Sequence, residues 1–493
     1  MMEESLEKAP AEETVVTQEN TLQKSTLRTG DAIAQSVALL ALVMGVALST
    51  SLAATTAGAA TPLAFIVAGL GSLCLGYVFI RFTRRMASVG GVYTYISQGL
   101  GPSAGFLGGW MYAGAFAVGI AFTMAIASVY LSTVLSTFHI AFGWLRVYAV
   151  LLVLLFAFGF FSIRISTRTQ LVLAVLGVVS VLVLTVMILV KGGAAGLSLT
   201  PFSFGALPQG IGGLFFATVF SFTSFIGFES AASLGAETAN PRKAIPRAIL
   251  TSVIVAIVFY VFVTYAFSIG YGVAHADKWA SDPAALDTLA MMYSNTTLAT
   301  IIDLMVAAGA FIASLAGLNL TARIMYAMGR EGGLPSVFGK AHARFKSPWV
   351  GVVVAVLITL ILGATVGRSF GIAYGPNGGP FTFFGFLATA ASLGILFTYI
   401  LVCVSGIFFF LRSQQDKGIA VVADVVLPVI AILLCGATIY YTVFPTSPTP
   451  FPINTAPIYT GVWLVLGLIL LAVLFFTNRE KVRQFGKTLS EGE

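Results

Sequence analysis

Long apolar segments follow one another along almost the whole chain, and they constrain the fold more than any other feature. A helix needs about 20 apolar residues to cross a hydrocarbon core of about 30 Å. Twelve such segments lie at 32–57, 62–80, 105–134, 145–161, 170–190, 212–235, 248–272, 298–328, 348–367, 380–412, 421–443 and 457–477. Charged residues make up only 9% of the chain, against about 25% in soluble domains. The sequence therefore predicts an all-α polytopic membrane protein with twelve transmembrane helices.

The positive charges are distributed unevenly between the predicted loops. All but four of the 26 lysines and arginines fall on the side of the two termini, the exceptions being Arg146, Lys191, Lys278 and Arg368. Short loops rich in Lys and Arg stay in the cytoplasm. We therefore expect a multi-pass plasma-membrane protein with both termini in the cytoplasm. The polar tail at 1–30 has no apolar core of a secretory signal and is expected to be disordered, and a second tail follows at 479–493.

The composition excludes several classes of protein. The cysteines Cys74, Cys403 and Cys435 all fall inside apolar segments and the three histidines lie far apart, so we expect neither a disulfide framework nor a metal centre. The sequence has no G-x-S-x-G element and no acidic metal cage, which argues against an enzyme. The net charge of +7 comes from basic residues in short loops and does not indicate nucleic-acid binding. The expected partners are the lipid bilayer and a small molecule.

A glycine and a carboxylate interrupt the sixth apolar segment. Gly227 and Glu229 lie in the run SFIGFESA, residues 224–231. A charged side chain at the bilayer centre costs about 2.5–3.5 kcal/mol on insertion scales. Non-helical backbone at this depth is tolerated where it is buried in protein or lines a cavity. We expect a broken helix and a substrate site here. The alternative interpretation is a packing glycine beside a carboxylate that contacts neighbouring helices.

The first apolar segment contains a glycine at the matching position. Gly45 lies in Val43–Val46, near the middle of the segment, as Gly227 does in the sixth. Interrupted segments at corresponding positions of two halves indicate an inverted-repeat transporter. The two five-helix repeats would cover about 32–190 and 212–412, within a transport core at 31–412. Two further helices would lie within 413–478.

An unwound helix at each of these positions would suit a zwitterion. The freed backbone N–H groups attract a carboxylate, and the freed carbonyl groups accept from an ammonium group. Glu229 would then contact the amino group or exchange a proton. A second acidic residue, Asp303, is either a coupling carboxylate or, as we favour, a marker of the external end of its helix. Six further residues are weaker candidates for the walls of the site: Trp110, Tyr112, Phe383, Phe384, Ser392 and Thr398.

Three motifs resemble those of amino acid–polyamine–organocation permeases. The run GFESAASLGAETANPRKAIPRAI, Gly227–Ile249, is similar to the sixth-helix signature of that family. In this signature a GFE-type break precedes an acidic residue and an NP-x-x-x-IP-x-A turn, here Glu229, Glu237, Asn240, Pro241, Ile245, Pro246 and Ala248. The segments GGVYTY, Gly90–Tyr95, and RIMYAMGREGGLP, Arg323–Pro335, are similar to two further family motifs. The resemblance covers about residues 30–480.

The resemblance implies a leucine-transporter-like five-plus-five fold in which helices 1 and 6 are broken and helices 11 and 12 are peripheral. It implies a secondary active transporter of amino acids or related amines that works by alternating access. The alternative is an amine or polyamine importer, or an amino acid exchanger, of the same fold. The implied substrate-binding residues are Val43, Met44, Gly45, Val46, Thr223, Phe225, Ile226, Gly227 and Glu229.

Two departures from the family pattern concern substrate and coupling. The family has a G-S-G-type triplet at the first break, whereas Val43 and Met44 precede Gly45 here, which leaves room for an amine substrate. The family's fifth-helix lysine is replaced by Gly177, so lysine-type proton coupling is not expected. No cofactor is expected. Proton coupling through Glu229, Na⁺ bound by hydroxyls such as Ser314, and obligatory exchange all remain open, as does the oligomeric state.

Overall fold

The structure is almost entirely helical. The computed structural model describes residues 36, 40–86, 91–161, 167–230, 232, 241–345, 347–412 and 419–477, and within these residues every regular element is a helix. The predicted tails, and the motif residues Gly90, Glu237 and Asn240, lie outside the described residues. The all-helical fold class expected from the sequence is confirmed.

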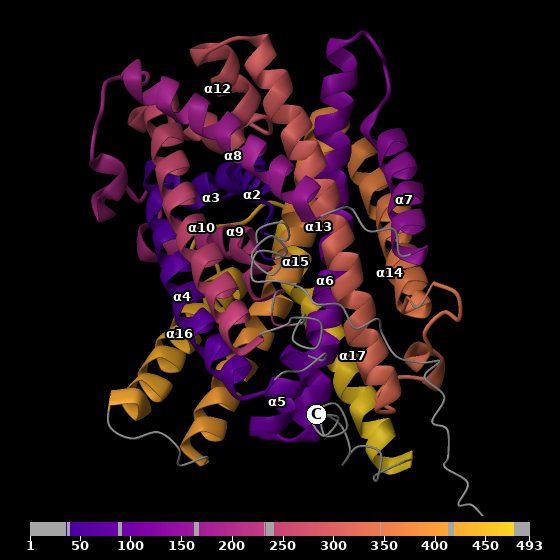
Figure 1. Cartoon of the computed structure of the whole chain (residues 1–493). Helices are drawn as coiled ribbons and strands as arrows, with labels where there is room; N and C mark the ends of the chain where they lie inside the picture. Colours follow the sequence, from indigo (N-terminus) through magenta and orange to yellow (C-terminus); the bar gives the residue numbers. More distant parts are fainter. Residues whose placement is uncertain are drawn as a thin grey trace, which may run out of the picture.

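The helices form one bundle (Figure 1). Their bounds are α2 (Leu42–Ala47), α3 (Ser49–Ala57), α4 (Thr61–Arg85), α5 (Val92–Leu100), α6 (Pro102–Thr137), α7 (Trp144–Phe160), α8 (Thr167–Val190), α9 (Gly210–Phe225), α10 (Pro241–Tyr271), α11 (Ala276–Ser281), α12 (Ala285–Tyr293), α13 (Thr296–Arg330), α14 (Trp349–Leu362), α15 (Arg368–Arg412), α16 (Ile419–Val443) and α17 (Ala456–Thr477). A five-residue π-helical stretch, Gly363–Gly367, joins α14 to α15.

Local sequence signals explain where several helices begin. Pro62 and Pro102 stand in the first turns of α4 and α6, where a missing N–H is tolerated. The side chain of Asn295 caps α13 by accepting from the Leu298 N–H at 3.0 Å. Gly375, with a φ of 75°, interrupts α15 just before Pro376. This kink divides α15 into a short first part, which continues from α14, and a long final part.

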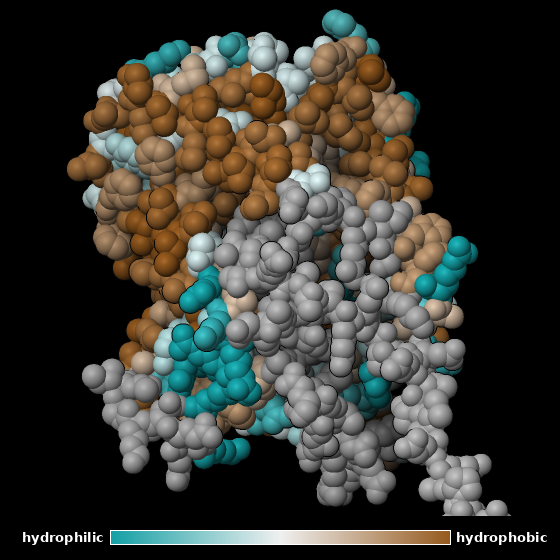
Figure 2. All heavy atoms as spheres, viewed as in Figure 1, coloured by the Kyte–Doolittle hydropathy of each residue, from teal (hydrophilic) through white to brown (hydrophobic). Residues whose placement is uncertain are grey.

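Ten helical stretches among the described residues are long and apolar enough to cross a membrane. The first, Leu42–Arg85, contains α2, α3 and α4 and so covers two of the predicted segments, while α7 is apolar but has only 17 residues. Figure 2 shows hydrophobic residues over most of the described face, with hydrophilic residues gathered toward its ends. The chain is a multi-pass membrane protein, and the count of twelve spans stays a prediction.

The central helices surround α2, α3 and α9. Helices α6 and α13 pack together along much of their length, α15 packs on α6, and α4 packs on α10. Helix α17 lies at the periphery, because only 6% of its most apolar window is buried inside the protein. The short helix α5 is largely buried, and it packs against α6 and α15.

The two predicted breaks have different outcomes. Helix α9 ends at Phe225, and Ile226 and Gly227 are not helical, with a φ of 109° at Gly227. In the first segment, however, Val43–Val46 are helical and belong to α2, so their predicted unwinding is wrong. The non-helical residues flank this piece, at Ala41 with a φ of 41° and at Leu48 with a φ of −120°. Val43, Met44 and Val46 are all buried, and packed apolar side chains of this kind favour the helical backbone.

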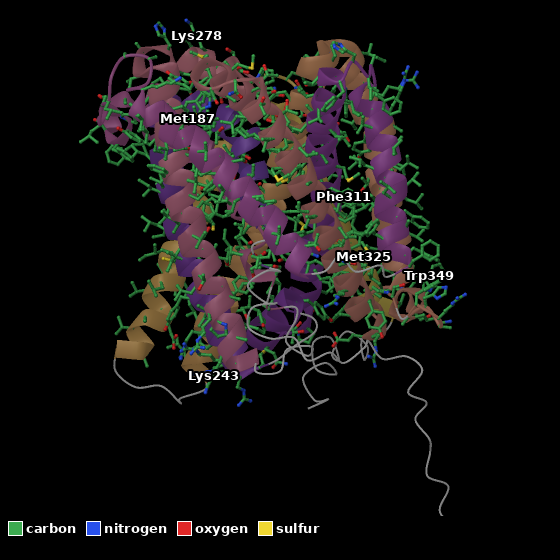
Figure 3. All side chains as sticks on the ribbon, turned by 45° about the horizontal axis from the view of Figure 1, so that its top comes forward. Met187, Lys243, Lys278, Phe311, Met325 and Trp349 are labelled. Carbon is green, nitrogen blue, oxygen red and sulfur yellow. The ribbon has the colours of Figure 1, made fainter. Side chains whose placement is uncertain are left out.

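Two segments that connect longer helices contain short helices. The segment between α10 and α13 folds into α11 and α12, whose residues Trp279, Leu286 and Leu289 are fully buried. The segment after α13 contains one short 3₁₀ helix, Ser336–Gly339. Lys278 and Lys243 lie at opposite ends of the bundle (Figure 3).

Candidate functional site

Helix α2 meets the end of α9 at Gly45. The Ser224 hydroxyl donates to the Gly45 carbonyl oxygen at 3.2 Å, and the Tyr260 hydroxyl donates to the Ser224 carbonyl oxygen at 2.9 Å. A Cβ atom placed on Gly45 would lie only 2.4 Å from the Tyr260 hydroxyl oxygen. Gly45 is therefore required for close approach of α2 to α9 and α10, which brings the two predicted break regions together.

Glu229 ties the interrupted end of α9 to two other helices. Its Oε1 accepts from the Tyr112 hydroxyl of α6 at 2.6 Å and from the Tyr399 hydroxyl of α15 at 2.7 Å. Its Oε2 accepts from the Gly227 N–H at 3.2 Å. The side chain is 2% exposed. A buried carboxylate needs such donors to offset its lost hydration, and here they fix the backbone at the break.

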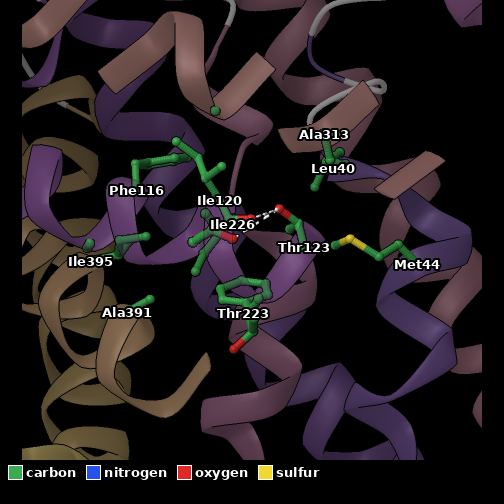
Figure 4. Close-up of a pocket in the computed structure, with 14 residues that line it drawn as sticks. Leu40, Met44, Phe116, Ile120, Thr123, Thr223, Ile226, Ala313, Ala391 and Ile395 are labelled. Carbon is green, nitrogen blue, oxygen red and sulfur yellow. Dashed lines mark hydrogen bonds between the residues drawn. The ribbon is translucent and has the colours of Figure 1, made fainter. Parts of the chain in front are cut away.

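A small cavity lies beside this break, at the centre of the bundle (Figure 4). Its walls come from α2, α6, α9, α13 and α15, and the lining residues are Leu40, Met44, Ala115, Phe116, Gly119, Ile120, Phe122, Thr123, Thr223, Ile226, Ala313, Gly317, Ala391 and Ile395. None of these residues carries a charge, and Glu229 is not among them. The cavity therefore suits an apolar group.

Two threonine hydroxyls are the polar side-chain groups in this lining. Thr223 Oγ1 lies 2.5 Å from the Ser392 hydroxyl oxygen, and Thr123 Oγ1 lies 2.8 Å from that of Ser314. Thr123 also donates toward the carbonyl oxygens of Gly119 and Ile120 at 3.0 Å, as drawn in Figure 4. Ser314, the predicted Na⁺ ligand, thus lies behind the wall and contacts α6 through Thr123.

A second small cavity lies on the other side of α2. It is lined by residues of α2, α8 and α13, among them Val43, Met44 and Gly177. A Cβ atom on Gly177 would lie 3.0 Å from a methyl group of Val43. Gly177 therefore faces the first helix and provides no amino group there.

The structure brings together most of the predicted site residues but not all. Met44, Thr223 and Ile226 line the central cavity, and Gly45, Gly227 and Glu229 adjoin it. Phe225 does not line it, because its ring packs on Tyr260 with centroids 5.3 Å apart. Val46 does not line it either, although it is fully buried and its carbonyl oxygen accepts from Thr50.

The six candidate wall residues also separate into two groups. Tyr112 bonds Glu229 and Ser392 pairs with Thr223, so both support the site. Phe384 packs on Phe122, which lines the cavity, and so lies behind its wall. The other three pack or bond elsewhere: Trp110 stacks on Trp463, Phe383 packs on Trp144, and Thr398 donates to the Gly394 carbonyl. Asp303 is 3% exposed, about two turns into α13, and interacts with Asp287 of α12.

Sequence reasoning missed Tyr399 and much of the apolar lining. Tyr399 follows Thr398, which was a candidate wall residue, but only the fold shows that its hydroxyl reaches a carboxylate 170 positions earlier. Phe116, Ile120 and Ala391 carry no signal beyond their apolar character.

A helical membrane protein whose interrupted helix adjoins a central cavity has the architecture of a secondary transporter. The chain belongs to the amino acid permease family, whose model matches residues 35–470. It is 25% identical to the branched-chain amino acid permease BcaP of Lactococcus lactis, over 90% of this chain and 94% of the relative. It is 28% identical to the low-affinity putrescine importer PlaP of Escherichia coli, over 61% of this chain and 66% of the relative.

Two further comparisons agree with this assignment. A methylthioribose transporter of Bacillus subtilis is 25% identical over 85% of this chain and 88% of the relative. Among solved structures, a manganese transporter of Eremococcus coleocola shares the fold with a TM-score of 0.54, covering 95% of this chain and 99% of that one at 13% identity. The protein is thus a permease of the amino acid–polyamine–organocation superfamily, a secondary transporter of amino acids or related amines and not an enzyme.

Proposed function

We propose that this permease carries neutral amino acids with apolar side chains. The observation that supports this is the lining of the central cavity, in which a substrate side chain would meet methyl, methylene and phenyl groups and no charge. Each CH₂ group buried there contributes about 0.8 kcal/mol. An ammonium group in the same place would lose its hydration without an ionic partner, at a cost of several kcal/mol.

The backbone around the break would hold the two charged ends of the substrate. Helix α9 ends at Phe225, and in its last turn the Phe222 carbonyl accepts from the Ile226 N–H and the Ser224 carbonyl from the Tyr260 hydroxyl. The other carbonyl groups of this turn have no partner in a continuing helix and are suited to an ammonium group. Val43–Val46 lie opposite the end of α9, across the hydrogen bond between Ser224 and Gly45, and would contact the substrate carboxylate. In this proposal Glu229 is a positioning residue, because its oxygens already accept from Tyr112, Tyr399 and Gly227.

The proposal includes the finer architecture expected from the sequence. Twelve spans would form two inverted five-helix repeats with helices 11 and 12 outside them, in the plasma membrane and with both termini in the cytoplasm. The contact between α2 and α9, and the extensive packing of α6 on α13, support a pairing of the first helix with the sixth and of the third with the eighth. The charge distribution supports the orientation.

Coupling to H⁺ or Na⁺ is a further part of the proposal. Three donors on Glu229 stabilise its carboxylate form, whereas its burial favours the protonated form, so proton coupling, Na⁺ coupling and exchange are all compatible with this residue. The paired hydroxyls of Ser314 and Thr123 offer oxygen atoms of the kind that hard cations bind. Imposed Na⁺ and H⁺ gradients across proteoliposomes distinguish these modes.

An amine or polyamine importer is the second candidate. Val43 and Met44 occupy the first two positions of the family's G-S-G-type triplet, and the putrescine importer is among the relatives. A diamine has no carboxylate to be held at the first helix, so this departure would not impair its binding. The uncharged cavity lining argues against it, since the second ammonium group would find no partner there.

The deciding experiment is counterflow in proteoliposomes loaded with unlabelled leucine. We expect labelled leucine to accumulate, and excess valine or isoleucine to compete while lysine and putrescine do not. Competition by putrescine and not by leucine would establish the second candidate instead. Counterflow by none of these compounds would overturn both.

A matched pair of variants tests the cavity itself. A Cβ atom on Gly119 meets only Phe122, at an ordinary 3.7 Å, so Gly119→Val narrows the cavity without a clash. We expect leucine affinity to fall by more than about 10-fold, because one methylene-sized change in an apolar pocket costs about 10–200-fold and valine adds three carbon atoms, while alanine is still carried. Gly461→Val, at an exposed position on α17, is the control and should leave leucine affinity and alanine transport unchanged.

A further inference from the structure

A larger cavity lies between the peripheral helix α17 and the rest of the bundle. It has a volume of about 630 Å³ and is lined by residues of α6, α14, α15 and α17 and of the segment just before α17. Protein interiors are close-packed, with few voids larger than a water molecule. A gap of this size therefore calls for an occupant.

Specific contacts hold α17 in place around this gap. Trp110 and Trp463 stack with centroids 4.4 Å apart, and each indole N–H donates to the other residue's carbonyl oxygen, at 3.0 and 3.3 Å. The Thr460 hydroxyl donates to the Ala390 carbonyl oxygen at 3.0 Å. The cavity is thus a fixed feature of how α17 docks, with contacts to both α6 and α15.

The cavity offers no free hydroxyl donor on its serines and threonines. Thr365, Ser369 and Thr455 donate to backbone carbonyl oxygens at 2.6, 2.8 and 2.7 Å, as Thr460 does to Ala390. The other lining side chains are apolar or aromatic, and none is charged. A buried water needs two to four polar partners, and a polar ligand needs similar ones. The occupant must therefore be apolar.

The position of the cavity identifies the source of an apolar ligand. Its lining residues Tyr459, Val462 and Leu466 are 61%, 55% and 44% exposed, so this wall is continuous with the lipid-facing surface of α17. Tyr459 stands near the start of α17, where an amphipathic ring suits the level of lipid headgroups. We propose that the cavity holds one acyl chain of a membrane phospholipid.

This site adjoins the central cavity. Ala115 of α6 and Ala391 of α15 line both cavities, so their small side chains form part of the wall between them. An acyl chain in the outer cavity would support this wall and limit how far the central cavity can widen. The link to substrate size rests on the proposed function, whereas the lipid site itself does not.

Photo-cross-linking in nanodiscs tests the site directly. The probe is a phosphatidylcholine with a diazirine on one acyl chain, and cross-linked peptides are located by mass spectrometry. We expect enrichment in residues 111–118 and 459–466 over the lipid-facing surfaces of α8 and α10. Equal labelling of all lipid-facing helices would overturn the proposal, and so would weaker labelling of residues 111–118 and 459–466 than of α8 and α10.

Two tryptophan variants on α6 provide the matched comparison. Val118 lines the cavity and Val129 does not, although both are partly buried on the same helix. Val118→Trp should abolish the enrichment, whereas Val129→Trp should retain it. If Val118→Trp fails to fold, excess unlabelled phosphatidylcholine should suppress the enriched cross-links of the unaltered protein, and failure to suppress them counts against the site. Because the readout is cross-linking, a wrong substrate assignment leaves it unaffected.

Discussion

Glu229 accepts hydrogen bonds from three elements, and each partner constrains its role. Glu229→Gln replaces one acceptor oxygen with an amide nitrogen, so one of the Tyr112, Tyr399 or Gly227 donors loses its partner. Hydrogen bonds to charged groups contribute about 1.5–3 kcal/mol. We expect the variant to fold but to lose about tenfold or more in counterflow rate. Counterflow across a pH series, with the thermal midpoint as a check of folding, measures this.

Tyrosine variants provide the controls for this prediction. Tyr399→Phe removes one donor and should cause a smaller loss than Glu229→Gln. Tyr148→Phe removes a hydroxyl that donates to the Thr359 carbonyl, away from the site, and should leave counterflow unchanged. Uptake by Glu229→Gln that matches the unaltered protein at every pH would exclude the residue from the mechanism.

The sequence identifies site residues that are unusual in an apolar helix, but it does not identify those that are common there. Gly227 and Glu229 stand out because neither a flexible residue nor a carboxylate belongs in an apolar span without a reason. Tyr399 does not stand out, because aromatic residues in such spans are more often packing or interfacial residues. Its role depends on the approach of α15 to α9, which the pattern of apolar residues does not specify.

Among the elements, the contact of α2 with α10 depends on the absence of a side chain. Gly45→Ala would place a methyl group 2.4 Å from the Tyr260 hydroxyl oxygen and 3.0 Å from the Ser224 Cβ. We expect a lower thermal midpoint and weaker leucine binding. Tyr260→Phe removes the closest atom, so the double variant should recover part of the loss, with a coupling energy of about 0.5–3 kcal/mol. Gly309→Ala, with open space at its Cβ position, should have neither effect. Strictly additive losses would contradict the contact.

The first helix also shows why a break cannot be placed from one glycine. Val43, Met44 and Val46 are buried and helical, and the irregular backbone falls at Ala41 and Leu48, which carry no such signal. At Gly227 the left-handed φ of 109° requires a glycine, so there the residue type and the break coincide.

The short helix α12 should make stability depend on pH. Asp287 interacts with Asp303 of α13, and its burial, with the nearby charge of Asp282, raises the pKa of Asp287 above its usual value of about 3.9. A raised pKa means that the stabilisation is complete at low pH and is lost as the pH rises through the folded-state value. We expect Asp287→Asn to flatten the decline of the thermal midpoint that begins as the pH rises above about 3.9. Asp277→Asn, at an exposed position on α11, should keep the pH dependence of the thermal midpoint seen in the unaltered protein. If the two variants show the same pH dependence, Asp287 is not its source.

Over the whole molecule, hydrophobic length and charge placement predict more than side-chain detail does. Each predicted apolar segment is largely helical in its described residues, because an apolar stretch in lipid must satisfy its own backbone, and the breaks at Ala41, Leu48 and Gly227 are local. Apolar length does not show that α5 and α12 pack into the bundle, since both are too short to span a membrane. Nor does it predict the gap behind α17, which depends on the two tryptophans that hold that helix.

The orientation in the membrane is the last prediction, and it concerns the protein as a unit. If both termini are cytoplasmic, Ser281 at the end of α11 lies outside and Ser336 after α13 lies inside; both are exposed. Ser281→Cys should react with a membrane-impermeant maleimide on intact cells, and Ser336→Cys only after permeabilisation. The unaltered protein controls for Cys74, Cys403 and Cys435, of which the last two are fully buried. Reaction of Ser336→Cys alone on intact cells would invert the topology. Reaction of both variants on intact cells would place both positions outside, and the predicted single membrane crossing between them would then be wrong.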